Sequence, residues 1–564
     1  MELTGAQILM ECLEREGVDL IFGYPGGSVI DIYDELSRHP AIRHILVRHE
    51  QAAVHAADGY ARALGKTGVC LVTSGPGATN AVTGIATAYS DSIPLVIFTG
   101  QVPTHLMGND AFQEVDIIGI TRPCVKHSYL VNDISKMAEI IRQAFFLARS
   151  GRPGPVLVDL PRNVITASGE FVWPEVVHMR SYHPTYKPNL VQIRRAADLV
   201  LGAVRPLILS GGGVIRSDSS AVLAHIARSF HIPVVSTLMG LGGFPGNDPL
   251  WFGMVGMHGS VAANRAIGEA DVLLAVGTRF ADRVTGKVSV FASRARIIHI
   301  DIDPTSIRKN VNVDVPIVAD CLEAVTALKD VLATKTGGRD RGEDRAPWLE
   351  RLDRIRREHP LSYIRDGSLK PQEVIEAVCS IAGGDNIVVS TEVGQHQMWT
   401  AQFFTFTRPR SFLSSGGLGT MGYGLPAAMG AQLAMPDKQV VCIAGDGSIQ
   451  MNSQEFITIV SNRLPVKVVV LNNGYLGMVR QWQELFFKRN YSCTNMEAQP
   501  DFLKLAEAYG AEGYRITEPG SLIPDLTRAL TSPNPAIIDV HVAREENVYP
   551  MVPAGAALDE MILV

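Results

Sequence analysis

A loop in the last third of the sequence places a carboxylate in an unusual position. Asp446 stands between Gly445 and Gly447, directly after the apolar run VVCIA, which is typical of a buried strand. The next such run, VKVVVL, ends in Asn472 and Asn473, and 24 residues separate this pair from the Gly-Asp-Gly tripeptide. Because the carboxyl ends of neighbouring parallel strands meet at one edge of a sheet, the two loops are expected to lie close together.

Side chains of this kind at a sheet edge suit a divalent cation and a diphosphate. Asp446 and Asn473 offer side-chain oxygens and Tyr475 a backbone carbonyl, which are the hard ligands that Mg²⁺ prefers. The two glycines leave room for a diphosphate, Ser448 adds a hydroxyl, and the helix expected next would present its N-terminal N–H groups to the anion. Taken alone, Gly-Asp-Gly is also an ordinary turn between a strand and a helix, and the Asn pair is what favours the metal site.

A second acid stands at the start of an expected helix. Glu50 follows an apolar strand-like run and precedes the Ala-rich segment QAAVHAADGYARA. An acid in this position is most often an exposed residue of the first helical turn, where the helix dipole favours a negative charge. Residue type and position therefore leave its role open.

The elements that must position these residues form three blocks of alternating apolar strands and amphipathic helices. The blocks cover residues 1–165, 190–333 and 348–564. This rhythm predicts an α/β protein of three doubly wound parallel-sheet domains. A Pro-rich stretch from Ile165 to Leu190 is expected to link the first two domains, and the charged segment from Thr334 to Pro347 the last two. Strands that end in SGPG in the first block and in GDGS in the third form a weak echo, which suggests a duplication.

Length and composition agree with a large globular protein. The 564 residues exceed what one core accommodates, and 46% of them are apolar and 19% charged. A formal charge of -6, with no basic run, argues against nucleic acid as a partner. The seven cysteines are scattered without metal-binding spacing, and neither a secretory leader nor a membrane span is expected, so the predicted location is the cytoplasm.

Longer motifs carry a family resemblance. The Gly-Asp-Gly and Asn-Asn pair resembles the signature of thiamine diphosphate (ThDP) enzymes, and from near the N-terminus to Met551 the chain resembles the catalytic subunits of acetohydroxyacid synthases, also called acetolactate synthases. The matching segments are GYPGGSVIDIYD, RHEQAAVHAADGYAR, SGPGATN, GQVP, DAFQE, GRPGPVLVDLP, GMHG, VGQHQMW, GGLGTMGYGLPAA and YPMVP. The resemblance implies a pyrimidine-binding and a pyrophosphate-binding module on either side of a Rossmann-like central domain.

The resemblance assigns residues to both ends of ThDP. Glu50 becomes the catalytic acid, because a protonated carboxyl bonded to the pyrimidine ring promotes the imino form that removes the proton from the thiazolium carbon. Met421 would keep the cofactor bent, and His396 is assigned to binding rather than to catalysis. The implied ThDP-binding residues are Gly394, Gln395, His396, Gly419, Met421, Gly445, Gly447, Ser448 and Asn473, and the implied Mg²⁺ ligands are Asp446, Asn473 and Tyr475.

A second cofactor, FAD, is implied for the central block. The segments GGG and HIDID are by themselves a weak dinucleotide signal, because the spacing G-x-G-x-x-G is missing. By resemblance, FAD contacts Arg152, Gly211, Gly212, Gly213, Thr237, Leu238, Gly256, Met257, His258, Gly277, Arg279, Asp301, Asp303 and Asp320. Joining two ketoacids needs no redox step, so the role implied for FAD is structural.

Four residues are implied as substrate contacts, namely Phe112, Gln113, Arg283 and Trp482. The guanidinium of Arg283 suits the carboxylate of a second ketoacid, and Trp482 is implied to favour 2-ketobutyrate over pyruvate. Two positions depart from the family pattern. Ala281 in RFADR replaces an acid, and Arg162 in DLPRN replaces a lysine, which bears on FAD binding and on the access channel.

The implied activity is that of an acetohydroxyacid synthase. Pyruvate is decarboxylated on ThDP and the two-carbon unit is joined to a second pyruvate or to 2-ketobutyrate, the first common step of valine, leucine and isoleucine synthesis. The family shares its ThDP between subunits, so a homodimer is the minimal active unit expected, with a homotetramer and a small regulatory subunit as further partners to consider. The alternatives are an FAD- and ThDP-dependent pyruvate oxidase and a non-catalytic paralogue.

Overall fold

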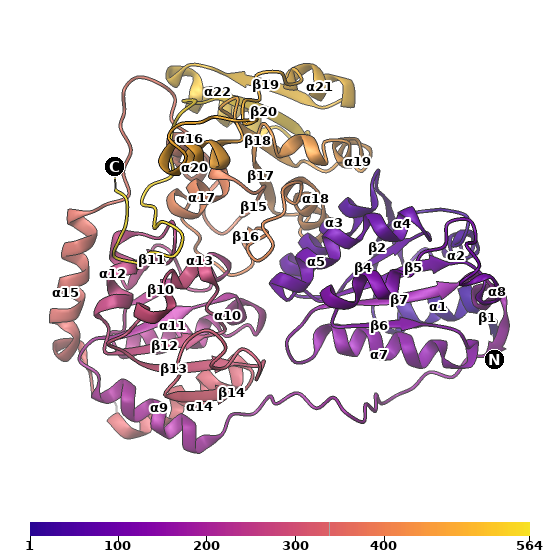
Figure 1. Ribbon diagram of the computed structural model, residues 1–564, viewed down its shortest axis with the longest axis horizontal. Helices are drawn as coiled ribbons and strands as arrows, with labels where there is room; N and C mark the ends of the chain where they lie inside the picture. Colours follow the sequence, from indigo (N-terminus) through magenta and orange to yellow (C-terminus); the bar gives the residue numbers. More distant parts are fainter. Residues whose placement is uncertain (338, 564) are drawn as a thin grey trace.

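The computed structural model describes residues 1–337 and 339–563, and Gly338 and Val564 lie outside the described residues. Three six-stranded parallel sheets organise the chain into a first, a central and a third domain (Figure 1). This arrangement confirms the predicted α/β fold of three doubly wound domains. Within the described residues, no helix is long and apolar enough to cross a membrane.

The first domain is built on the strand order β3-β2-β4-β5-β7-β6. Its first helix begins where Thr4 and Gln7 form a capping box. The strands are β2 (Leu20–Tyr24), β3 (Arg43–Leu46), β4 (Gly68–Val72), β5 (Leu95–Gln101), β6 (His127–Leu130) and β7 (Pro155–Pro161). The helices are α1 (Gly5–Arg15), α2 (Ile30–Leu36), α3 (Glu50–Leu64), α4 (Pro76–Asn80), α5 (Val82–Asp91), α6 (Ile117–Thr121), α7 (Met137–Arg149) and α8 (Arg162–Thr166).

The central domain has the strand order β11-β10-β9-β12-β13-β14, which is the doubly wound order of dinucleotide-binding domains. Its strands are β9 (Pro206–Ser210), β10 (Val234–Ser236), β11 (Trp251–Met254), β12 (Val272–Val276), β13 (Arg296–Asp301) and β14 (Val315–Val318). Its helices are α9 (Leu190–Gly202), α10 (Gly212–Arg216), α11 (Ser220–Ser229), α12 (Val261–Glu269), α13 (Asp282–Thr285), α14 (Cys321–Thr336) and α15 (Gly342–Glu358).

The third domain repeats the topology of the first. In β16-β15-β17-β18-β20-β19 the second strand of the domain lies outermost, followed by the first, third, fourth, sixth and fifth, as in the first domain. The strands are β15 (Ile387–Thr391), β16 (Phe412–Leu413), β17 (Gln439–Gly445), β18 (Lys467–Asn472), β19 (Glu512–Ile516) and β20 (Ala536–His541). The helices are α16 (Pro371–Ala382), α17 (Gln395–Phe403), α18 (Gly424–Ala434), α19 (Glu455–Ser461), α20 (Gly477–Phe486), α21 (Phe502–Tyr509) and α22 (Pro519–Thr531). The shared order supports the duplication suggested by the sequence echo.

The first connection between domains is shorter than expected. The segment Ile165–Leu190 begins with the end of α8 and then forms β8 (Ser168–Glu170), which pairs antiparallel with β1 (Glu2–Thr4). Only residues 171–189 then run without helix or strand to α9, along the lower edge of Figure 1.

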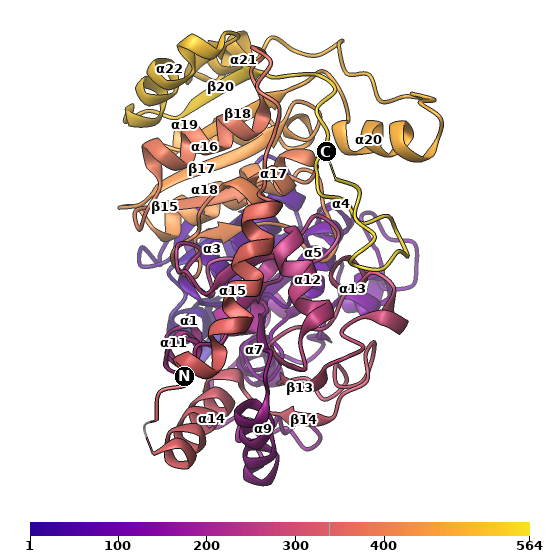
Figure 2. The same ribbon diagram turned by 90° about the vertical axis from the view of Figure 1, so that its left-hand side faces the viewer.

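The second connection between domains differs more from the linker expected from the sequence. Much of the segment Thr334–Pro347, which includes Gly338 outside the described residues, is helical, because α14 ends at Thr336 and α15 begins at Gly342. Trp348 and Leu352 of α15 are buried in the core of the central domain, so the packing extends that domain to the end of α15. The C-terminal segment also returns to the central domain, where the backbone N–H of Val552 donates to Met257 and the segment lies beside α13 (Figure 2).

Helices α3 and α18 join the first and third domains into one core. Small residues line their crossing. A Cβ on Gly59 would lie 2.2 Å from the carbonyl oxygen of Ala427, and one on Gly430 would lie 1.9 Å from that of Ala56. The two helix backbones therefore touch, and only glycine fits at these two positions.

Candidate active site

Two neighbouring strands of the third domain end at a small cavity. β17 and β18 pair in register up to Gly445 and Leu471, so the Gly-Asp-Gly and Asn-Asn loops meet, as the sequence predicts. The cavity measures about 80 Å³. Ten of the eleven residues predicted for the diphosphate and the metal line it, namely Gly394, Gln395, His396, Met421, Gly445, Asp446, Gly447, Ser448, Asn473 and Tyr475. Gly419 instead lines a larger cavity next to it.

Asp446 has a buried carboxylate oxygen that is suited to bind a metal ion. Its side chain is 1% exposed, and Oδ2 has no hydrogen-bond partner. Burial raises the pKa of this carboxyl to about 7, although the backbone N–H groups of Asn473 and Gly474 oppose the rise. A buried carboxylate oxygen without a partner costs folding free energy, and a bound cation or a proton would remove that cost. The oxygens of Asp446, Asn473 and Tyr475 fit Mg²⁺, and no cluster of three or more His, Cys, Asp or Glu side chains suited to a metal occurs in the described part of the chain.

The neighbouring residues form a cradle for an anion. Nε2 of the buried His396 has no partner, and burial lowers the pKa of the ring to about 3, so the imidazole is neutral. A Cβ on Gly445 would lie 2.9 Å from His396 Nδ1, and one on Gly477 would lie 2.1 Å from Gln395 Oε1, so a larger residue at either position would displace one of these two side chains. The helix expected directly after Ser448 is absent, because a single 3-10 turn follows there. Instead α17 and α20 begin at the cavity, and their first N–H groups are the ones placed for an anion.

Glu392 was missed by sequence reasoning. It is fully buried just after β15, where its carboxylate accepts hydrogen bonds from the backbone N–H groups of Gly422 at 2.6 Å and Leu425 at 3.1 Å. Burial raises its pKa to about 7, against the effect of those N–H groups. Glu392 thereby fixes the backbone next to Met421. An acid directly after a strand in STEVG is the signal that could have pointed to it.

The larger cavity, of about 680 Å³, lies between the three domains. Eleven of the residues expected at FAD line it, namely Arg152, Gly212, Gly213, Thr237, Leu238, Met257, His258, Gly277, Arg279, Asp301 and Asp320. The other three residues expected at FAD do not line this cavity, namely Gly211, Gly256 and Asp303. Asp303 instead pairs at 3.2 Å with Arg152, which does line the cavity. The other two pack on backbone, since a Cβ on Gly211 would meet the carbonyl oxygen of Gly277 and one on Gly256 that of Arg283.

Two of the expected substrate contacts meet in this larger cavity. Arg283 and Trp482 both line it, beside Met478 and Gly419. Arg283 contacts the Asp282 carboxylate at 2.9 Å, and the ring of Trp482 lies edge-on to Phe486. Of the two departures from the family pattern, Ala281 lines the cavity, and Arg162 lies 3.4 Å from Asp31 at the surface of the first domain.

Glu50, Phe112 and Gln113 lie on the first domain and line neither cavity. Glu50 is the first residue of α3, is only 9% exposed, and accepts a hydrogen bond from Asn80 Nδ2 at 2.9 Å. Phe112 is 88% exposed, and Gln113 has a φ of 59°. Within one chain, the structure therefore keeps the expected catalytic acid apart from the expected diphosphate site.

Comparisons with known proteins agree with this geometry. Three family profiles match in order: "Thiamine pyrophosphate enzyme, N-terminal TPP binding domain" over residues 3–120, "central domain" over 193–328 and "C-terminal TPP binding domain" over 392–540. The fold and the site thus define a thiamine pyrophosphate enzyme.

Relatives that match over nearly the whole chain identify the family within the thiamine pyrophosphate enzymes. The chain is 50% identical to an acetolactate synthase large subunit of Parasynechococcus marenigrum, over 99% of this chain and 91% of the relative. It is 48% identical to the acetolactate synthase isozyme 3 large subunit of Escherichia coli and 46% identical to the acetolactate synthase large subunit of Haemophilus influenzae, in both cases over 100% of this chain and 98% of the relative. The chain belongs to the acetolactate synthase large-subunit family.

Proposed function

We propose that this chain catalyses the acetolactate synthase reaction, in which pyruvate is decarboxylated and its two-carbon unit is joined to a second pyruvate or to 2-ketobutyrate. One observation carries the proposal. Gly394 and Met478 line both cavities, so a cofactor anchored in the smaller cavity lies beside Arg283 and Trp482 in the larger one. Neither a pyruvate oxidase nor a non-catalytic paralogue is favoured by the comparisons.

The smaller cavity would hold the diphosphate of ThDP with Mg²⁺. Asp446, Asn473 and Tyr475 supply the protein oxygens, and the N-termini of α17 and α20 face the anion. When bound, ThDP supplies the carbon nucleophile and the electron sink for decarboxylation. The protein's own part is to anchor, orient and exclude water. Met421, held by the backbone that Glu392 fixes, is the wedge that keeps the two rings close.

FAD is the proposed occupant of the larger cavity. The cavity volume of about 680 Å³ suits a dinucleotide, as do the strand order of the central domain and the glycines after β9. Ligation of two ketoacids transfers no electrons to a flavin, so its role here is to complete the wall between the domains.

Glu50 is proposed to act on a cofactor held by a second copy of the chain. It lines neither cavity of its own chain, and α3 is already packed against α18. A homodimer, in which each first domain faces the third domain of its partner, would bring the carboxyl to the pyrimidine ring, where it holds a proton at the ring nitrogen. A homotetramer would be a pair of such dimers. A small regulatory subunit is a further candidate partner, since the relatives are named large subunits.

Arg283 and Trp482 are proposed to select the second substrate. A guanidinium presents a fixed pair of N–H donors to a carboxylate, and the indole beside it adds apolar surface for a longer ketoacid. Replacement of Trp482 by Leu is expected to lower the ratio of acetohydroxybutyrate to acetolactate when both ketoacids compete. Phe486→Leu, which changes the neighbouring ring, is the matched control and should leave that ratio nearer the wild-type value.

The purified chain tests the reaction directly. It is incubated without oxygen with pyruvate, ThDP, Mg²⁺ and FAD, and CO2, acetolactate and flavin absorbance are followed together. Acetolactate formed with CO2 while the flavin stays oxidised supports the proposal. Flavin reduction without acetolactate would indicate a pyruvate oxidase, and absence of CO2 release would indicate a non-catalytic protein.

A further inference from the structure

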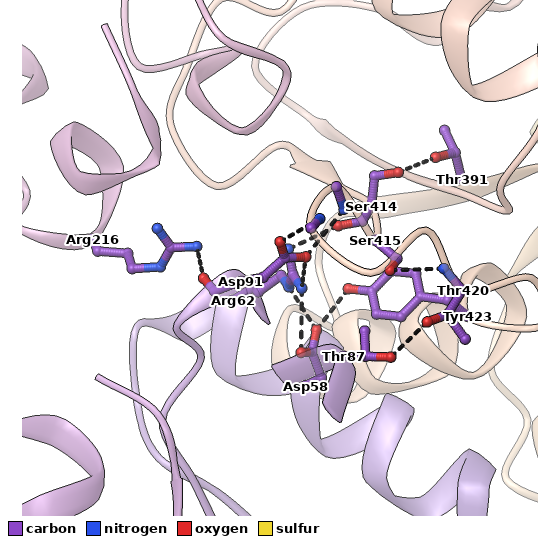
Figure 3. A network of polar contacts seen from close by, with 12 residues as sticks. Asp58, Arg62, Thr87, Asp91, Arg216, Thr391, Ser414, Ser415, Thr420 and Tyr423 are labelled. Atoms are coloured by element: carbon purple, nitrogen blue, oxygen red, sulfur yellow. Dashed lines mark hydrogen bonds and ion pairs between the residues drawn. The ribbon is translucent and has the colours of Figure 1, made fainter. Parts of the chain in front are cut away.

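A buried ion cluster of the first domain lies between the three domains, outside the residues assigned to either cofactor (Figure 3). Its members are Asp58 and Arg62 on α3 and Asp91 at the end of α5, and all three are buried. Arg62 Nε donates to Asp58 Oδ1 at 2.6 Å, and Arg62 Nη2 donates to Asp91 Oδ2 at 2.9 Å.

The cluster is bonded to one segment of the third domain, residues 414–423, here called the crest loop. The backbone N–H groups of Gly416 and Gly417 donate to the Asp91 carboxylate at 3.1 and 2.8 Å. Arg62 Nη1 donates to the carbonyl oxygen of Ser414 at 2.9 Å. The loop is thus fixed at one end by charged groups from a different domain.

The far end of the crest loop is held in the same way. The Tyr423 hydroxyl donates to Asp58 Oδ1 at 2.7 Å, and the hydroxyls of Thr87 and Thr420 lie 2.7 Å apart. Between these fixed points the loop carries Gly419, which lines the larger cavity, and Met421, which lines the smaller one. The first domain therefore sets the position of a loop that forms part of both cavity walls.

Asp91 also belongs to the wall of the larger cavity, where the central domain reaches it. Arg216 Nη2 donates to the backbone carbonyl of Asp91, and both residues line that cavity. A Cβ on Gly417 would lie 2.8 Å from Asp91 Oδ1 and 2.8 Å from Arg279 Nη2, so both side chains lie close to the backbone of Gly417. A ligand in the larger cavity that pairs with Arg216 or Arg279 would act directly on the residue that holds the crest loop.

Arg62 keeps its charge, whereas burial raises the pKa of Asp58 against the opposing effects of Arg62 and the Tyr423 hydroxyl. Burial works against the charge of Arg62, but the negative charges around it, Asp58 foremost and Asp91 as well, outweigh that effect and hold the pKa of the guanidinium well above its ordinary value. A buried, charged and fully bonded network of this kind admits essentially one arrangement, because a partly bonded one would leave a buried charge unpaired.

We propose that Arg62 and Asp91 are positioning residues that hold the crest loop in the shape that binds ThDP, and that Asp91 couples this loop to the larger cavity. Occupancy of the larger cavity by FAD then strengthens the binding of ThDP with Mg²⁺ in the smaller one, and the reverse effect has the same size. This inference rests on the proposed function, because it takes ThDP and FAD as the two ligands.

The test measures binding of ThDP with Mg²⁺ by intrinsic fluorescence, with and without saturating FAD, on the full chain. Asp91→Asn removes the charge and keeps the shape. It is expected to raise the half-saturating ThDP concentration about tenfold, as for loss of a charge-assisted hydrogen bond, and to abolish the shift that FAD causes in the wild type. Glu16→Gln is the matched control. Glu16 has a buried carboxylate, and both of its ion-pair partners, Arg142 and Arg149, belong to the first domain.

The outcomes are separable. If the wild type binds no ThDP, the proposed function fails, whatever the variants do. If the wild type binds ThDP and FAD with coupling, and Asp91→Asn retains the same affinity and the same coupling, or Glu16→Gln loses as much, the positioning role is wrong. Should Asp91→Asn not fold, Tyr423→Phe removes one bond of the crest loop and is expected to weaken ThDP binding about threefold, whereas Tyr129→Phe, whose hydroxyl bonds Gln143 within the first domain, is expected to have no effect. Equal affinities in these two tyrosine variants would likewise overturn the proposal.

Discussion

The first and third domains follow the same strand order, yet the carboxylates at the carboxyl edges of their sheets stand in different surroundings. Glu50 is 9% exposed and has a partner in Asn80, whereas Asp446 is 1% exposed and leaves Oδ2 without one. Asp446 lines the smaller cavity together with several glycines and the N-termini of α17 and α20, whereas Glu50 lines neither cavity. Topology therefore places an acid at the same edge of both sheets, and the different surroundings support the two roles proposed here, a cation ligand for Asp446 and proton transfer for Glu50.

The largest effect is expected when the acid of the first domain, Glu50, is changed. Glu50→Gln is expected to lower acetolactate formation by about 10² to 10⁴-fold, the usual range for loss of a general acid or base. ThDP binding should persist, because the smaller cavity, which Glu50 does not line, anchors the diphosphate and Mg²⁺. Steady-state assays together with the fluorescence titration check both points. Glu139→Gln, an exposed acid in the first turn of α7, serves as the control. Activity above a tenth of the wild-type value would assign proton handling to another group.

The counterpart change in the third domain is expected to act on binding. Loss of groups around a metal already costs about 10 to 100-fold in affinity, so Asp446→Asn, which removes a direct ligand, should weaken Mg²⁺-dependent ThDP binding by at least about 100-fold. In the wild type, ThDP with Mg²⁺ should raise Tm, since a ligand that binds only the folded state stabilises it. The variant should lose that rise, and without ligands its Tm should not fall, because Oδ2 has no protein partner to lose.

A control acid on the same domain keeps this prediction specific. Asp437→Asn alters an exposed residue of the loop before β17 and should retain the full ligand-dependent rise in Tm. A rise of equal size in Asp446→Asn would mean that the metal is held elsewhere.

The smallest effect is expected where the two domains touch. Gly430→Ala places a methyl group against the Ala56 carbonyl at the crossing of α3 and α18, and overpacking of this kind costs about 1 to 3 kcal/mol of unfolding free energy. Gly268→Ala is the matched control, because it lies within α12 with nothing within 4 Å of the added carbon, and a gain of about 0.4 to 1 kcal/mol is expected there. Denaturant unfolding measures both. A cost at Gly268 as large as at Gly430 would show that helix crossing is not the cause.

Much of the fold could be predicted from the sequence, because the strands are continuous apolar runs that end in turn residues. VVCIA and VKVVVL became β17 and β18, and the strand-end rule brought Asp446 and Asn473 together. Helix α15 was missed because its composition is mostly charged. The apolar residues Trp348, Leu352 and Ile355 nevertheless recur at helical spacing, and all three are buried in the central core.

The polar contacts between domains were beyond sequence reasoning. Asp58 and Arg62 form a simple i, i+4 pair on one helix, which is usually a solvated contact. Only the folded chain brings Asp91 and the crest loop to that pair and buries the side chains of Asp58, Arg62 and Asp91. Glu392 is a similar case, since its role depends on where the backbone of Gly422 and Leu425 returns.

The contact of bare backbone at Gly59 and Gly430 has a mechanical consequence. Two helices that meet without intervening side chains cannot slide or roll past one another, so the outer domains of one copy behave as a single rigid body. Opening that admits ketoacids and releases the product is then expected from the central domain, which residues 171–189 connect to the first domain, or, in the proposed homodimer, from the junction between the two copies.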